Sequence, residues 1–242
     1  MTNQRSWFSN NLQREVNASV SGHYGFCLLL FPTFTDSHEE NEQNGLLASI
    51  SSLIKHGFCR VFCIEGIMNQ SWLSNSITDA EKSDLHFRYN KFIEEEVVQF
   101  IFTECSGPVP IMTCGASFGG FLAANSYFRR PDIFLGTIAM SSTFNIQHFS
   151  KDFFDENCYF NSPIHYLPNL TDYYWMSFLV SKRHVYLASG SGENEFPENT
   201  HHLSHLLNSK GINHKTDIWN NSWGHNYETW KKMLPNILKS SI

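Results

Sequence analysis

Residues 109–125 read VPIMTCGASFGGFLAAN, in which a serine pentapeptide separates an apolar run from a helix-compatible run. This order predicts a strand, a sharp turn and a helix, with Ser117 at the turn between Gly115 and Gly119. Such a turn lifts the serine hydroxyl above the sheet, and residues without a Cβ are needed where backbone and helix crowd it. Ser117 is therefore a candidate nucleophile, although a small-residue loop that only joins a strand to a helix has the same pattern.

A nucleophilic serine needs a base, and His225 has the expected position in the chain. It follows the last predicted strand, Lys215–Trp219, and precedes a helix predicted over residues 228–238. In enzymes with a serine on a strand–turn–helix, the nucleophile, the acid and the histidine occur in this order. An imidazole suits the task because its ordinary pKa lies near neutral pH, so it can accept the serine proton and return it.

The acid is expected between these two residues, in the loop after a strand predicted over 184–188. Glu193 and Glu195 both lie in this loop, and either carboxylate could hold the imidazole in the required tautomer. We favour Glu195 because the residues before it leave room for the loop to bend back toward His225. Glu193 remains the alternative. A third interpretation is that both glutamates are solvated charges of the loop, which is the usual environment of this residue type.

Composition favours one compact domain over residues 1–242. The chain is 41% hydrophobic and 15% aromatic, and it has no linker-like, low-complexity or repeated segment. The net charge is −6 and the sequence shows no basic stripe. Both observations argue against nucleic acid and anionic membranes as partners. We expect a small-molecule substrate, and a homo-oligomer is compatible with the sequence.

The N-terminal residues and the cysteines favour a cytoplasmic location. Residues 1–7 lack the apolar segment of an export signal, and no run reaches the length of a membrane span. The six cysteines lie mostly in apolar runs without C-x-x-C spacing, as reduced buried thiols do. Cys114 is expected to pack in the strand before Ser117 and not to act as a nucleophile.

Strands and helices are predicted to alternate along the chain, which implies a parallel sheet covered on both faces. Ligands of such sheets bind beyond the carboxyl ends of the strands. There we expect residues 31–34, Glu65, Ser117, the pair Ser141-Ser142 and the Glu195 loop to converge. An irregular aromatic segment, residues 145–182, is expected either at the rim of the pocket or in ordinary packing. Further predicted strands are 24–31, 60–64, 109–113 and 134–140, and further helices are 44–56, 84–102 and 119–128.

Four segments resemble those of a known family: LLLFPT (28–33), GASFG (115–119), YFNSPIHYLPNL (159–170) and GHNYETW (224–230). The family comprises bacterial esterases of the α/β-hydrolase superfamily, related to enterochelin esterases and S-formylglutathione hydrolases. The resemblance covers nearly the whole chain and implies an α/β-hydrolase fold without a large cap domain. It also implies a triad of serine, histidine and acid. The acid loop of the family, Gly-x-x-Glu, falls on residues 192–195 and so favours Glu195.

The chain departs from this family at two positions. Where the family continues Phe-Pro-Thr with Ser-Gly-Gly, this sequence has Phe34-Thr35-Asp36, so the backbone of the oxyanion loop is expected to be altered. The resemblance implies that Phe118 N–H is one oxyanion donor and that the second comes from Thr33 or Phe34. Asn226 stands where relatives have aspartate, and we expect it to tune the surroundings of His225 modestly or not at all.

Together these observations predict a serine hydrolase that cleaves a carboxylic ester of a small molecule without metal or organic cofactor. Ser117 attacks the carbonyl, His225 transfers the proton and Glu195 orients His225. An acyltransferase with the same residues and a non-catalytic binding protein on the same fold remain alternatives. His201 and His205 have a spacing that can bind zinc, but no third ligand accompanies them, so a solvated helix face is favoured.

Overall fold

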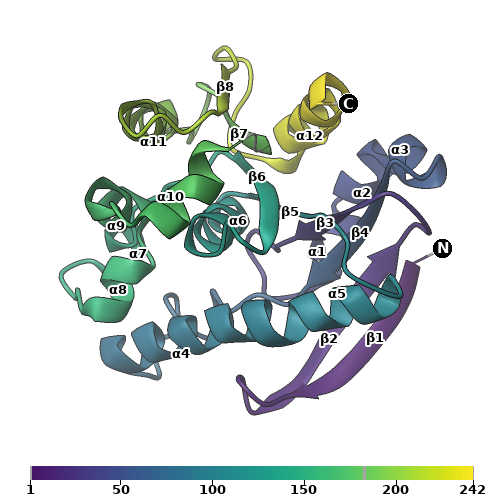
Figure 1. The fold of residues 1–242 in the computed structure, drawn as a ribbon, viewed down its shortest axis with the longest axis horizontal. Helices are drawn as coiled ribbons and strands as arrows, with labels where there is room; N and C mark the ends of the chain where they lie inside the picture. The colour runs from purple at the N-terminus through teal and green to yellow at the C-terminus, as the bar shows by residue number, and fades with distance from the viewer. Residues whose placement is uncertain (1, 182–183, 242) are drawn as a thin grey trace.

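A single eight-stranded sheet forms the centre of the molecule in a computed structural model, which describes residues 2–181 and 184–241. The strands are β1 (Thr2–Ser9), β2 (Arg14–Ser21), β3 (Phe26–Leu30), β4 (Cys59–Ile64), β5 (Ile111–Ala116), β6 (Phe134–Met140), β7 (His184–Ser189) and β8 (Lys215–Ile218). Their order across the sheet is β1-β2-β4-β3-β5-β6-β7-β8 (Figure 1). Strands β3 to β8 run parallel, whereas β1 and β2 form an antiparallel hairpin that pairs with β4. The predicted parallel sheet is therefore confirmed.

Helices cover both faces of this sheet. They are α1 (Glu40–Gln43), α2 (Leu46–Ser49), α3 (Ser51–Lys55), α4 (Asp79–Lys91), the π-helical stretch η1 (Phe92–Val97), α5 (Val98–Glu104), α6 (Phe118–Arg129), α7 (Gln147–Ser150), α8 (Glu156–Phe160), α9 (Pro163–Asn169), α10 (Tyr173–Val180), α11 (Pro197–Ser209) and α12 (Tyr227–Ser241). Helices α4 to α6 pack on one face, and α2 and α12 pack on the other (Figure 1).

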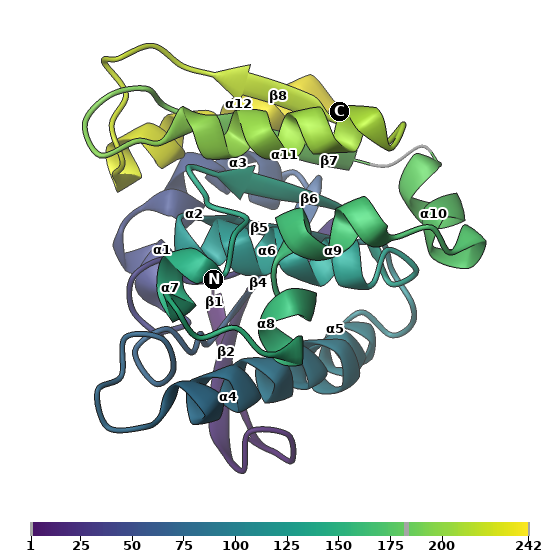
Figure 2. The same cartoon turned by 90° about the vertical axis from the view of Figure 1, so that its left-hand side faces the viewer.

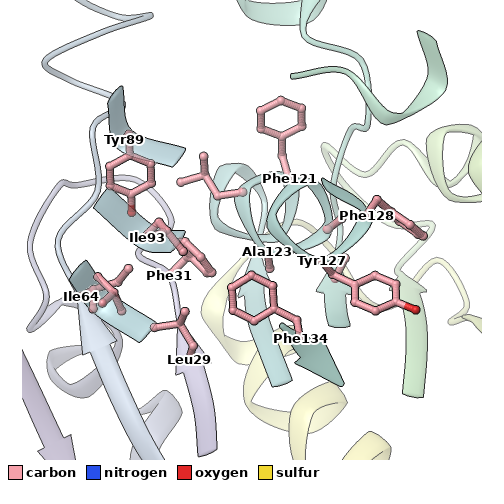
Figure 3. Packing of buried hydrophobic residues seen from close by; sticks show 14 of the residues in the cluster. Leu29, Phe31, Ile64, Tyr89, Ile93, Phe121, Ala123, Tyr127, Phe128 and Phe134 are labelled. Atoms are coloured by element: carbon pink, nitrogen blue, oxygen red, sulfur yellow. The ribbon is translucent and has the colours of Figure 1, made fainter. Parts of the chain in front are cut away.

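The strand β3 shows how the sequence builds this double-sided core. Its side chains alternate, so that Leu28 and Leu30 join the apolar cluster beneath α2 and α12. Leu29 and Phe31, the residue just after the strand, join the other cluster, which also contains Ile93 of η1 (Figure 3). All of these side chains are buried. A strand with two apolar faces belongs in the middle of a covered parallel sheet, which is where β3 lies.

Helix α6 is the most deeply buried helix segment and positions the turn that precedes it. Every residue from Phe118 to Phe128 is buried. Ala123 points toward the strands, whereas Phe121 points away from them (Figure 3) and its ring contacts those of His86 in α4 and Phe149 in α7. A helix that is buried on nearly every side belongs in a protein core. The first turn of α6 is therefore fixed against the carboxyl end of β5.

The N-terminal hairpin was not predicted from the sequence. Strand β1 is largely exposed and polar, so it lacks the apolar alternation that signals a half-buried strand. The hairpin is held by Trp7, whose ring stacks on Phe92 and Phe100 and whose Nε1 donates to Glu96 at 3.2 Å. Antiparallel edge strands of this kind tolerate polar residues on the solvent side.

Two predicted helices differ from those observed. The helix expected over 44–56 is divided into α2 and α3, and Gly45 before α2 has a φ of 78° that ends the preceding turn. The helix expected over 84–102 begins earlier, at Asp79, because Thr78 and Glu81 form a capping box. It continues through η1 and α5 to Glu104.

The segment expected to be irregular, residues 145–182, contains the short helices α7 to α10. Figure 2 shows these helices as one group between α4 and α11. Capping aspartates explain two of them: Asp155 accepts from Cys158 N, and Asp172 accepts from Trp175 N. Lys182, the last residue of the expected segment, lies outside the described residues.

Within residues 2–181 and 184–241, no helix combines the length and apolar character that crossing a membrane requires.

We predict that Phe134→Ala lowers the free energy of unfolding by about 3–5 kcal/mol. Phe134 is 0% exposed in β6 and packs near α6, so truncation leaves a cavity (Figure 3). Urea denaturation measures the loss. The matched control is Phe8→Ala on the hairpin, where Phe8 is 52% exposed and truncation should cost about 1 kcal/mol or less. Equal losses in the two variants would contradict the assigned core.

Candidate active site

Ser117 occupies a strained turn between β5 and α6. Its φ of 54° and ψ of −122° lie outside the regions that residues with a Cβ normally adopt. The turn is fixed by Ser117 N, which donates to Met140 O at 2.9 Å. It also requires glycine at two positions, because a Cβ on Gly119 would lie 2.5 Å from Pro32 O and one on Gly115 would overlap the backbone of Gly119. The predicted strand–turn–helix is thus observed with the serine at its apex.

His225 lies next to the serine hydroxyl. Its Nε2 is 2.9 Å from Ser117 Oγ, although the two residues are 108 positions apart in the chain. The loop that holds it is fixed by two backbone bonds to the acid loop, since His225 N donates to Glu193 O and Gly192 N donates to Trp223 O, both at 2.9 Å. The imidazole packs edge-on against the Trp230 ring, with the centroids 5.2 Å apart.

Of the two candidate acids, Glu195 lies beside the imidazole and Glu193 does not. The distance from Glu195 Oε2 to His225 Nδ1 is 3.7 Å, and the Glu195 side chain is 1% exposed. This distance exceeds that of a hydrogen bond, and Nδ1 is buried without a hydrogen-bond partner. The Glu193 side chain is exposed, and the residue contributes its backbone carbonyl to the His225 loop.

Two serine hydroxyls hold the Glu195 carboxylate in place. Ser141 Oγ donates to Oε1 at 2.5 Å and Ser189 Oγ donates to Oε2 at 3.1 Å. Ser141 in turn accepts a bond from Trp230 Nε1 at 2.9 Å, and its φ of 51° is a second strained backbone angle at the site. Such strain persists only where the surrounding structure fixes it.

The charged form of Glu195 is favoured in the folded protein. Burial alone would raise the pKa of its carboxyl group, but the neighbouring His225 and the hydroxyls of Ser141 and Ser189 outweigh burial and lower the pKa below its ordinary value of 4.5. The carboxylate is therefore negative at neutral pH and faces the imidazole edge opposite the serine.

The two N–H groups expected as second oxyanion donors are both engaged by Glu40. Thr33 N donates to Glu40 Oε2 at 3.2 Å, and Phe34 N donates to Glu40 Oε1 at 2.8 Å. Phe118 N–H, the other expected donor, lies in the first turn of α6, where backbone N–H groups have no acceptor within the helix. The altered sequence at 34–36 has no positive φ, so this loop does not depend on glycine.

Sequence reasoning missed Glu40 and the supporting roles of Ser141 and Trp230. Glu40 carries no motif, but a glutamate beginning a helix seven residues after Thr33 could have suggested a loop acceptor. Ser141 was expected at this end of the sheet, but the sequence did not indicate which residue it would contact. Asn226 caps α12, because its Oδ1 accepts from Thr229 N at 3.1 Å.

A small cavity opens beside Ser117 and His225. Its volume is about 160 Å³, and Phe118, Phe149 and Phe196 form its apolar walls, with Asn199 among the polar residues. Pockets that hold drug-sized ligands measure roughly 300–1,000 Å³, so this one suits a compact group. Two positions were expected for the aromatic segment, the rim of the pocket or ordinary packing. Phe149 of this segment lines the cavity beside Ser117.

Structural contacts account for Glu65 and Cys114, which the sequence analysis discussed, and for Trp72 in the loop after β4. Glu65 accepts hydrogen bonds from Arg14 and Asn17 of the hairpin. Trp72 Nε1 donates to His86 Nδ1 at 3.1 Å in the core. Cys114 is buried in β5, and burial raises the pKa of its thiol.

The remaining aromatic and metal-site candidates do not reach Ser117. Tyr159, Phe160, Tyr166 and Trp175 line a different cavity of about 370 Å³ at the other end of α6. His201 and His205 are exposed on α11. Among the described residues, no group of three or more metal-ligating side chains is brought together.

Several solved structures share this architecture. A ferulic acid esterase superimposes with a TM-score of 0.75 at 17% identity, over 98% of this chain and 96% of its own. An S-formylglutathione hydrolase from Agrobacterium tumefaciens superimposes with a TM-score of 0.69 at 11% identity, over 99% and 95%. Fluorophosphonate-binding serine hydrolase F of Staphylococcus aureus reaches a TM-score of 0.64 at 14% identity, over 99% and 97%. The chain has the α/β-hydrolase fold that the sequence predicted.

No protein-family model matches the sequence, and no curated protein matches it.

We predict that Glu195 contributes stability that is lost in acid. Because its pKa is lowered from 4.5 in the folded state, the contribution is complete above pH 4.5 and disappears as the pH falls through the folded-state pKa. The free energy of unfolding of wild type should therefore approach that of Glu195→Gln as the pH is lowered from about 4.5 through the range in which the folded-state carboxylate takes up its proton. Urea denaturation at several pH values measures both curves.

The matched control is Glu193→Gln, which removes an exposed carboxylate two residues away. Its curve should stay parallel to that of wild type. A constant difference between wild type and Glu195→Gln across the same range would mean that the folded state does not favour the charged carboxylate.

Proposed function

We propose that this chain is a serine hydrolase that cleaves a carboxylic ester of a small molecule through an acyl-enzyme on Ser117. The observation that carries the proposal is the 2.9 Å contact between Ser117 Oγ and His225 Nε2 at a strained turn beside a cavity. A nucleophile within hydrogen-bond reach of a base, which is oriented by a third group, is the arrangement that activates a serine.

The reaction begins when His225 Nε2 accepts the hydroxyl proton and Ser117 Oγ attacks the ester carbonyl carbon. The carbonyl oxygen becomes an oxyanion, which Phe118 N–H stabilises at the start of α6. The tetrahedral intermediate then collapses, and the imidazolium gives its proton to the departing alcohol. Water enters, loses a proton to His225 and hydrolyses the acyl-enzyme, which restores Ser117 and releases the acid.

Glu195 stabilises the imidazolium that forms in both halves of this reaction. Its distance of 3.7 Å from Nδ1 is long in the resting structure. Catalytic hydrogen bonds commonly tighten once substrate is bound, and positive charge on the ring strengthens the attraction. The hydroxyls of Ser141 and Ser189 donate to the carboxylate, which favours its ionised form and keeps it oriented toward His225 before substrate binds.

The fold and its neighbours support an ester or thioester carbonyl as the target. The neighbours named above are a ferulic acid esterase, an S-formylglutathione hydrolase and a fluorophosphonate-binding serine hydrolase. An acyltransferase would use the same acyl-enzyme with an alcohol or amine in place of water. The His225 side chain is 19% exposed, which gives water access to the base, so we favour hydrolysis.

We predict that Ser117→Ala lowers kcat/KM for p-nitrophenyl butyrate by roughly 10⁴-fold or more. Glu195→Ala should lower it by roughly 10²-fold or more, because the imidazolium then loses its neighbouring charge. Glu193→Ala should change it less than about threefold, since its side chain is exposed. Full activity in Ser117→Ala would refute the proposed nucleophile, and a larger effect at Glu193 than at Glu195 would exchange their assigned roles.

We also predict a preference for short acyl groups. Phe196, which is 60% exposed and precedes α11, lines the cavity of about 160 Å³ beside Ser117. Phe196→Ala should raise the ratio of kcat/KM for p-nitrophenyl octanoate to that for the butyrate by roughly 3- to 10-fold. Phe160→Ala, in the other cavity, is the control and should leave the ratio unchanged. An unchanged ratio in Phe196→Ala would place the acyl chain elsewhere.

A further inference from the structure

Glu40 is a buried acid that the reaction described above does not use. It is 3% exposed at the start of α1. Besides the bonds from Thr33 N and Phe34 N, Oε2 accepts from Thr35 N and from Thr35 Oγ1, both at 2.8 Å. Three successive backbone N–H groups therefore converge on one carboxylate. An ionised carboxylate is an acceptor only, and bonds to it are stronger than those between neutral groups.

The loop that Glu40 holds lies directly beside Ser117. Pro32 O faces the first turn of α6, because a Cβ on Gly119 would lie 2.5 Å from it. In a trans peptide the N–H points away from the carbonyl, so Thr33 N–H is turned from α6 toward Glu40. The Phe34 ring continues the loop over the site, with its centroid 6.3 Å from that of His225.

Glu40 also connects this loop to the histidine side of the site. Tyr227 OH donates to Glu40 Oε1 at 2.8 Å and to Asn41 Oδ1 at 3.3 Å. Asn41 in turn donates from Nδ2 to Phe31 O at 2.9 Å, just before the loop. Burial raises the pKa of Tyr227, so its hydroxyl keeps the proton that makes the bond. Tyr227 begins α12, two residues after His225.

We propose that Glu40 is a positioning residue for acyl transfer: its carboxylate fixes the backbone of residues 33–35 beside Ser117 and, through Tyr227, ties it to the helix after His225. The inference rests on the proposed function. Phe34 N–H serves the oxyanion while it remains aligned by Glu40, as an N–H shared between two acceptors. Thr33 N–H, which is turned from α6, serves only to anchor the loop.

The direct test is Glu40→Gln, which replaces one acceptor oxygen with an NH₂ group. This group must face either the Thr33 and Thr35 donors or the Phe34 and Tyr227 donors, and either contact displaces the loop. We expect kcat/KM for p-nitrophenyl butyrate to fall about 10- to 100-fold, mainly through kcat. The inhibition constant of phenylboronic acid should rise by a similar factor, because its tetrahedral adduct uses the same donors.

Two further variants make the result specific to the loop. Glu42→Gln removes an exposed carboxylate from the same short helix and should change neither constant by more than about twofold. Tyr227→Phe keeps all three N–H bonds to Glu40 and removes only the tie to α12. It should shift both constants in the same direction by roughly 3- to 10-fold, and it gives the answer where Glu40→Gln fails to fold.

The outcomes separate this inference from the function on which it rests. Unchanged constants in Glu40→Gln and Tyr227→Phe, with an active wild type, would overturn the role of Glu40 alone. Faster hydrolysis in Glu40→Gln would also overturn it, since the carboxylate would then be competing with the oxyanion. A fall in kcat/KM with an unchanged boronate constant would overturn it as well, because the loop would then not act on the tetrahedral state. A wild type that neither hydrolyses esters nor binds the boronate would overturn the proposed function and the role of Glu40 with it.

Discussion

The backbone of Ser117 is the constraint on which the other features of the site depend. Its angles, φ 54° and ψ −122°, place the side chain at the end of β5 and the next residue in the first turn of α6. A residue with a Cβ holds such angles only when its surroundings leave no alternative. Those surroundings are the fully buried α6, the bond to Met140 O, and Gly119 packed on Pro32 O. The core thus supports the strain, and the strain presents the hydroxyl to His225.

Carboxylates fix the loops around this turn. Glu40 gathers the N–H groups of residues 33–35, and Asp36 accepts from Asn69 N and Gln70 N, both at 3.2 Å. Glu195 is held by Ser141 and Ser189. A buried charge is tolerated only with such partners, so each acid requires a specific set of donors. The loop sequence Phe34-Thr35-Asp36 is therefore compatible with an ordered loop although it lacks glycine.

The sequence predicted the parts of the fold that depend on local pattern. The alternation of predicted strands and helices along the chain identified the parallel sheet, and Ser117, His225 and Glu195 meet because each follows the carboxyl end of a parallel strand. Features that depend on distant partners were not predictable. The polar hairpin gains its stability from Trp7 on η1 and α5, and Glu40 meets Tyr227 across 187 positions of the chain. No local pattern records such pairings.

The most direct test of a nucleophilic Ser117 is covalent labelling of the native protein with a fluorophosphonate, followed by digestion and peptide mass spectrometry. The account predicts a single adduct on Ser117, formed in wild type and lost in His225→Ala, because the hydroxyl depends on the imidazole 2.9 Å away. Absence of an adduct in folded wild type, or an adduct on another residue such as Ser142, would contradict the assignment of Ser117 as the nucleophile.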